Sequence, residues 1–341
     1  MGFVILASIT LACTQQEKTI LKTQHDIQEI PETEIIEDDI TTEHEMLIQA
    51  PIAPNGFDPR SGIYALRNSD IDELLSLQNE IRILTIYTTN NPIEDFSFID
   101  KLLNLELLHI SSGREENVDL YFLRYIHNIE NLWLDVNFTT IDGTLLQHFE
   151  YLKRLTLGGT TVVNLIRILE LPNLESLSLR VNFRGDPIII ENISTESRLK
   201  FLDIFAGEVD LEYIRNFQQL NHLRLHSSHV TNLHMLDNTE LETLVLELFI
   251  DHREKINMEA FQKLNQLRNL IIIGFDIYDV RPLLSLPNLV FLMLRFNEVD
   301  IMPLTESETL RAIDISSDIY QNIQADIFTE QGIMITVEDR F

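Results

Sequence analysis

The sequence predicts a curved α/β solenoid, with a parallel β-sheet on its concave face and a mixture of helices and loops on its convex side. The pattern apolar-x-x-apolar-x-apolar occurs eleven times between residues 81 and 315, at intervals of 21 to 26 residues. A unit this short cannot bury its own apolar face, so neighbouring units must stack into one core. Of the 341 residues, 45% are hydrophobic and only 11 are glycine and 10 proline. This composition supplies a large core and excludes a collagen-like or disordered chain.

The charge of the chain narrows the classes of partner. There are 25 lysines and arginines against 54 acids, a net charge of −29. Nucleic acid is therefore excluded as the main partner, because phosphate binding relies on basic side chains. No apolar run reaches the roughly 18–20 residues of a membrane-spanning helix. The single cysteine, Cys13, excludes an internal disulfide and a cysteine-based zinc cluster.

The first 13 residues, MGFVILASITLAC, form an apolar segment that ends in small residues. Thr10-Leu11-Ala12-Cys13 resembles a bacterial lipobox, in which a cysteine that follows a small residue receives the lipid. The chain departs from that pattern because Leu11 stands two residues before the cysteine instead of three, and because lysine and arginine are absent from the segment. The resemblance implies lipidation of Cys13 and a location in the bacterial cell envelope, at the outer membrane or cell surface. The alternative is an apolar N-terminal segment of a cytoplasmic protein.

Residues 14–60 are predicted to form an acidic, disordered tether. They contain 11 acids, 3 bases and four prolines. Self-repulsion and proline both favour an extended chain. The acidic run Glu37-Asp38-Asp39 lacks the glycine and the spaced ligands of an EF-hand loop, so it does not indicate a calcium site.

The ends of the solenoid require caps, because stacking leaves apolar surface exposed there. Residues 61–80 are predicted to be an N-terminal helical cap, since apolar residues recur at helical spacing after Ile63 and since Asn68 and Ser69 are suitable N-cap residues. Residues 319–341 form the predicted C-terminal cap, with a closing strand at 332–337. The solenoid between them, residues 81–318, contains the eleven repeats. One return segment, residues 257–265, is predicted to be helical.

The repeat register can be read directly from the sequence. The first apolar residue of each motif is position 1, so positions 4 and 6 point into the core of the predicted strand. The position-1 residues are Ile81, Leu105, Ile129, Leu152, Leu174, Leu199, Leu220, Leu241, Leu267, Leu289 and Leu310.

These motifs resemble the leucine-rich-repeat superfamily, particularly the short repeats of about 22 residues in bacterial internalins. Two phrases that lead into strands, Leu171-Pro172-Asn173-Leu174 and Leu286-Pro287-Asn288-Leu289, support the resemblance, which covers about residues 63 to 341. The family places an inward asparagine three residues after the last leucine. This residue is present here as Asn137, Asn182 and Asn297, whereas Phe249 and Phe275 occupy the same place in other repeats.

Positions 3, 5 and 7 are predicted to point outward across the concave face, with position 8 at its edge. Solenoids of this kind bind partners on that face. Aromatic, arginine and apolar side chains recur there, as they do in protein interfaces. Apolar surface is concentrated in the C-terminal half, with Leu248 and Phe296 at its edge. The candidate protein-binding residues are Val245, Ile271, Ile273, Phe291, Met293, Arg295, Phe296, Trp133, His109, Phe201, Phe205 and Arg224.

Catalytic and metal-binding patterns are not found in the sequence. It contains no P-loop, nucleophile elbow, dinucleotide fingerprint or His-Glu-x-x-His motif. His222 and His226 are four strand residues apart, about 13 Å, which is too far for one zinc ion to bridge. Pairing across strands explains such residues better, with Asp203 beside Arg224 and Glu247 beside His226. We therefore expect no enzyme activity, cofactor or metal.

Two functions remain open at this point. The first is a lipid-anchored envelope protein that binds a host or envelope protein without catalysis. The second is a soluble intracellular leucine-rich-repeat scaffold or regulatory protein. Nothing in the sequence distinguishes a foreign partner from a second copy of the chain.

Overall fold

The computed structural model describes residues 57–58, 62–66, 71–88, 93, 95–112, 118–136, 139–159, 161–181, 187–190, 197–237, 239–249, 255–295 and 299–337. These residues fall within one unit, Ile52–Phe341. The lipobox segment, nearly all of the predicted tether, Phe296 and the three predicted ladder asparagines (Asn137, Asn182 and Asn297) lie outside the described residues.

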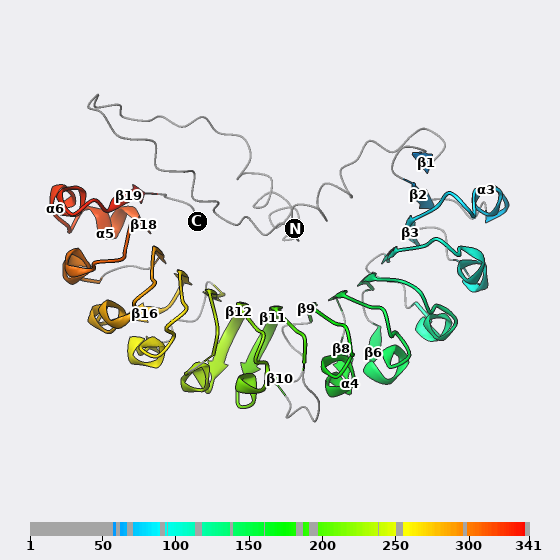
Figure 1. Cartoon of the computed structure of the whole chain (residues 1–341), viewed down its shortest axis with the longest axis horizontal. Coiled ribbons are helices and arrows are strands. Elements are labelled where there is room, and N and C mark those ends of the chain that lie inside the picture. The colour runs from blue at the N-terminus through cyan, green and yellow to red at the C-terminus, as the bar shows by residue number, and fades with distance from the viewer. Residues whose placement is uncertain are drawn as a thin grey trace. The chain divides into compact units, whose positions relative to one another are not determined.

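A long parallel sheet lines the inner side of this unit (Figure 1). Eleven of its strands begin two residues after the position-1 residues, which confirms the predicted fold and its register. Two further parallel strands extend the sheet at its ends. Within the described residues the thirteen parallel strands are β2 (Ile63–Leu66), β3 (Ile83–Tyr87), β4 (Leu107–Ser111), β5 (Asn131–Asp135), β7 (Arg154–Gly158), β9 (Ser176–Arg180), β11 (Phe201–Asp210), β12 (His222–Thr231), β13 (Thr243–Leu248), β15 (Asn269–Ile273), β17 (Phe291–Arg295), β18 (Ala312–Ile315) and β19 (Met334–Val337).

Short helices and strands carry the chain back on the outer side of the sheet (Figure 1). The helices are α3 (Ile71–Ser76), η1 (Ser97–Lys101), η2 (Leu120–Tyr125), η3 (Gly143–Leu146), α4 (Leu165–Leu169), η4 (Ile214–Asn216), η5 (Leu233–Leu236), η6 (Met258–Phe261), η7 (Arg281–Ser285), η8 (Met302–Glu306), α5 (Ser317–Tyr320) and α6 (Ala325–Glu330), where η marks 3-10 helices. The small strands are β6 (Thr140–Asp142) with β8 (Thr161–Val163), β14 (Lys255–Ile256) with β16 (Asp276–Ile277), β1 (Phe57–Asp58) antiparallel to β2, and β10 (Ile188–Ile189) beside β11.

The core lies between the sheet and the return segments. Leu132, Leu155 and Leu177, all at position 4, are at most 2% exposed. The prediction that position 8 lies at the edge of the concave face is wrong, because Val136 and Leu248 at this position are at most 4% exposed. The alternation of strand side chains simply continues, so that positions 4, 6 and 8 all face inward.

Aspartate and asparagine side chains start many of the return segments. Asp119, Asp142 and Asn257 precede 3-10 helices, and each side chain accepts a hydrogen bond from the backbone N–H two residues later, at 2.9–3.0 Å. Asp210 and Asp300 make the same bond. Such caps satisfy backbone donors that a short helix leaves unpaired. Part of the acidic excess of the chain therefore has a structural role.

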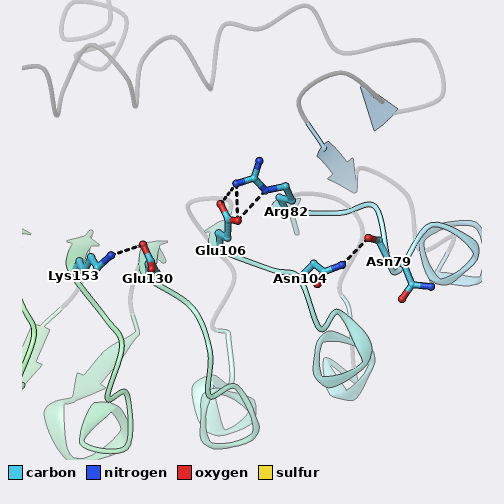
Figure 2. Close-up of polar contacts among 6 residues, drawn as sticks. All are labelled: Asn79, Arg82, Asn104, Glu106, Glu130 and Lys153. Atoms are coloured by element: carbon cyan, nitrogen blue, oxygen red, sulfur yellow. Dashed lines mark hydrogen bonds and ion pairs between the residues drawn. The ribbon is translucent and has the colours of Figure 1, made fainter.

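A second set of asparagines ties consecutive repeats together along one edge of the sheet. Asn104, Asn173 and Asn288 each stand directly before a position-1 residue. Each donates a side-chain hydrogen bond of 2.7 Å to a backbone carbonyl of the preceding repeat. Figure 2 shows the first of these bonds, from Asn104 to the carbonyl of Asn79. The Pro-Asn-Leu phrases of the sequence thus have a defined structural task.

The structure departs from the prediction at the N-terminal end of the sheet and agrees with it at the C-terminal end. The expectation of helix throughout residues 61–80 is wrong at Ile63–Leu66, which forms β2 and pairs in parallel with β3. All four residues of β2 are buried, and the strand supplies backbone partners to the first repeat, which a helix cannot do. Helix α3 follows it at Ile71–Ser76. At the other end, the expected closing strand forms as β19, at Met334–Val337. The domain boundaries stay predictions.

Candidate functional site

Three rows of side chains cross the concave face, at positions 3, 5 and 7 of each strand. In strands β3, β5, β15 and β17 these positions are partly exposed, while the residues between them are buried. The strands pair in one continuous register, so equivalent positions stand side by side. The candidate residues that the structure describes fall into three groups along these rows.

The first group is an aromatic cluster on β3, β4 and β5. The ring of His109 stacks on Trp133 with centroids 4.5 Å apart, and Tyr87 approaches His109 edge-on at 6.4 Å. Trp133 pairs with His109 on one side and Thr156 on the other, as predicted. His109 belongs to an outward row but is only 6% exposed, because its neighbours cover it. Trp133 is therefore the more accessible member of this pair.

The second group lies at the middle of the sheet, on β11 and β12. Phe205 packs edge-on against Phe249, with centroids 5.0 Å apart. Asp203 pairs across strands with Arg224, as expected, and accepts a hydrogen bond of 2.9 Å from the hydroxyl of Ser178. The ring centroids of Phe201 and His222 are 6.2 Å apart. Aromatic and charged groups are thus interleaved here.

His226 and Glu247 are in direct contact beside this second group, with Nδ1 and Oε2 2.8 Å apart. Burial raises the pKa of Glu247, but the hydrogen bond from His226 and the positive charges of His226, Arg224 and Arg295 outweigh burial and hold it below its usual value. The cross-strand pairing of Glu247 with His226 is confirmed. It occupies both side chains, so neither indicates a metal site.

The third group, which we call the apolar patch, consists of Val245, Ile271, Ile273, Phe291 and Met293. Val245, Ile271 and Met293 stand side by side on β13, β15 and β17, and all five side chains are partly exposed. Their register is continuous, so the substitution of phenylalanine for the ladder asparagine at 249 and 275 does not disturb it. Leu248 does not belong to the patch, because it faces the core.

One side of the apolar patch is bordered by a nearly buried ion pair. Arg295 donates to Asp314 at 3.1 Å, and their side chains are 10% and 13% exposed. Arg295 and Asp314 therefore form a polar border beside the patch, while Glu247 contacts His226.

The described part of the chain also bears on metal sites and membrane-spanning helices. Within it, no group of three or more metal-ligating side chains comes together. Over the same residues, no helix is long and apolar enough to cross a membrane.

No protein-family model and no curated protein matches the chain. A comparison with solved structures finds similar chains at low sequence identity. An internalin (inlF) from Listeria monocytogenes is 17% identical over 79% of this chain and 84% of its own, with a TM-score of 0.46. A second internalin from the same organism, internalin C2, is 19% identical over 71% of this chain and 83% of its own, with a TM-score of 0.35. The plant peptide hormone receptor RGFR1, solved in complex with RGF2, is 15% identical over 71% of this chain and 41% of its own, with a TM-score of 0.49.

The eleven repeats, each of which contributes one strand to a single parallel sheet, decide the fold. This is a leucine-rich-repeat solenoid. The leucine-rich-repeat strands carry the three groups described above, and their return segments carry the capping aspartates.

Sequence reasoning missed the row at position 2, which follows the same edge as the asparagine bonds. Arg82 pairs with Glu106 through contacts of 2.6–2.9 Å, and Lys153 pairs with Glu130 at 2.9 Å (Figure 2). Each pair joins neighbouring strands. Alignment of the repeats at position 2 contains the signal, because bases and acids face each other there.

Proposed function

We propose that this protein binds another protein, without catalysis, through the concave face of its leucine-rich-repeat solenoid. One observation carries the proposal, namely that five apolar side chains stand in register on three neighbouring strands and are partly exposed. Contiguous exposed apolar surface on a soluble domain marks an interaction site. The apolar patch is the principal contact surface, and the groups around Trp133 and around Phe201, Phe205 and Arg224 contribute further contacts.

The charge of the face supports this proposal. Positions 3, 5 and 7 hold four arginines and four acids, although the whole chain has a net charge of −29. Two of these residues, Arg295 and Asp314, neutralise each other beside the patch. A neutral, apolar surface is easier to desolvate than the acidic remainder of the chain.

Exchange of two patch residues for serine tests the proposal. We expect the Ile271→Ser/Phe291→Ser variant to keep its circular dichroism spectrum and cooperative melting but to lose retention of the partner on the immobilised protein. Serine removes apolar contact area at the centre of the patch. The matched control is Leu103→Ser/Tyr278→Ser, which changes two side chains that are 74% and 69% exposed and lie outside the concave rows.

The outcomes separate the alternatives. Loss of binding by the control as well would mean that the effect is not specific to the patch. Normal binding by the patch variant would contradict the proposal and move the contact to the cluster around Trp133. Loss of self-association in the patch variant, measured by light scattering, would identify the partner as a second copy of the chain.

We further propose that the protein is anchored in the bacterial cell envelope by a lipid on Cys13. The support is that the only cysteine of the chain ends an apolar segment with small residues before it. Metabolic labelling with a fatty-acid analogue should label the wild type and not a Cys13→Ala variant. An unlabelled wild type found in the cytosolic fraction would instead support the soluble scaffold.

A further inference from the structure

A groove lies along the edge of the sheet, on the same strands as the apolar patch. Its volume is about 420 Å³. Its walls come from residues at position 2 and from residues just before position 1, next to β13, β15, β17 and β18. The lining residues are Glu242, Gln266, Arg268, Pro287, Asn288, Val290, Thr309 and Arg311.

In the N-terminal half of the solenoid, the bases of the position-2 row are neutralised within the protein. Arg82 makes contacts of 2.6 and 2.7 Å from Nη2 to the two carboxylate oxygens of Glu106 (Figure 2). Lys153 and Lys200 pair with glutamates of the preceding strand at 2.9 and 3.0 Å. Their charges are therefore partly satisfied before any ligand arrives.

At the groove, the residues at position 2 are no longer paired as base with acid. Arg268, Val290 and Arg311 occupy position 2 in three consecutive repeats. The backbone N–H of Val290 donates to the carbonyl of Arg268, and the N–H of Arg311 donates to the carbonyl of Val290, both at 2.9 Å. An apolar residue thus stands where an acid would separate the two arginines. Within the described residues, neither guanidinium has a carboxylate partner within ion-pair distance, and the Arg311 side chain donates only to the carbonyl of Leu310. Both arginines are exposed.

We propose that this groove binds the carboxylates of an acidic, extended segment of the protein partner, with Arg268 and Arg311 as the anion-binding side chains. Guanidinium groups present paired donors that match a carboxylate. Glu242 is the single acid of the lining, so the groove keeps an excess of positive charge. The inference rests on the proposed function, since it names the chemistry of one part of the same partner.

The spacing of the groove favours an extended peptide with acids at alternate positions. Arg268 and Arg311 are two strands apart, which places their backbones roughly 10 Å from each other. Acidic side chains two residues apart on an extended peptide are separated by about 6.8 Å. The arginine side chains are long enough to span the difference between the spacing of their backbones and the spacing of the acids. Val290 and Pro287 form an apolar floor between them.

The site can be tested with a defined probe that requires no knowledge of the partner. The probe is a fluorescent octapeptide that alternates glutamate with threonine, and its counterpart contains glutamine in place of glutamate. Fluorescence anisotropy measures binding to the full chain. The variants are Arg268→Gln/Arg311→Gln and, as a matched control, Lys153→Gln/Lys200→Gln, which removes two bases that are already paired.

We expect the glutamate peptide to bind the wild type and the lysine control equally, and the arginine variant roughly tenfold more weakly. The glutamine peptide should bind all three proteins weakly, and added salt should weaken the glutamate peptide. Equal losses in the arginine and lysine variants would overturn the inference, since general charge attraction would then explain binding. Equal binding of the two peptides would overturn it as well.

The fate of the apolar patch distinguishes this inference from the proposed function. Ile271→Ser/Phe291→Ser should still bind the glutamate peptide, because neither residue lines the groove. If the patch variant loses the protein partner while the arginine variant keeps both partner and peptide, the proposed function stands and the groove does not. If instead the patch variant keeps the protein partner while the arginine variant loses both partner and peptide, the groove stands and the patch does not.

Discussion

Replacement of Leu155 by aspartate should lower the free energy of unfolding by roughly 4–5 kcal/mol. Leu155 stands at position 4 of β7 and is 1% exposed. Its backbone pairs with Leu132 on one side and Leu177 on the other, and both of these are buried too. A carboxylate there is buried without a partner in the middle of a continuous apolar column. Denaturant unfolding followed by circular dichroism measures the loss.

The control is Thr156→Asp, one residue later on the same strand. Thr156 is partly exposed on the concave face, so the new carboxylate stays in water and the expected change is within about 0.5 kcal/mol. A large loss in Thr156→Asp together with a small one in Leu155→Asp would mean that the strand is turned by one residue. In that case the assignment of inner and outer faces would be wrong.

A methyl group added at Gly143 should cost about 1–3 kcal/mol, because it overpacks the contact between two return segments. Gly143 is the first residue of η3. A Cβ atom there would collide with the backbone carbonyl oxygen of Asn164 in the next repeat and would lie 3.1 Å from Cγ1 of Ile168. The Asn164 side chain also donates to Asp142 at 2.8 Å, so this junction has little freedom to move. Thermal unfolding of Gly143→Ala measures the effect.

Gln147→Ala is the matched control, because Gln147 is exposed at the end of the same 3-10 helix. This variant should unfold as the wild type does. A Gly143→Ala protein that is as stable as the wild type would show that the two return segments separate easily. The stacking of repeats would then depend on the sheet and core alone.

The fold follows from the sequence wherever burial alone dictates it. The leucines of the motif have to be inside, so their spacing fixes the strands, their register and the outward rows that carry Trp133 and the apolar patch. The same logic predicts Asp203 beside Arg224 and Glu247 beside His226, because parallel strands in register place equivalent positions together. Periodicity therefore gives both the core and the composition of the concave face.

Other features depend on particular neighbours, which a periodic pattern does not specify. Ile63–Leu66 forms a strand because the first repeat offers backbone partners, although its apolar residues also fit helical spacing. Val290 stands between Arg268 and Arg311 in the groove lining, and its effect on their charges depends on these neighbours in space.

Photo-crosslinking from the centre of the apolar patch tests most directly whether the concave face binds the partner. The photoreactive amino acid p-benzoylphenylalanine replaces Met293 in one protein and, in a second, replaces Tyr121 of the return helix η2, which is 52% exposed. After irradiation, mass spectrometry identifies the crosslinked protein. We predict a crosslinked partner from position 293 and none from position 121. Crosslinks from position 121 alone would contradict binding through the concave face.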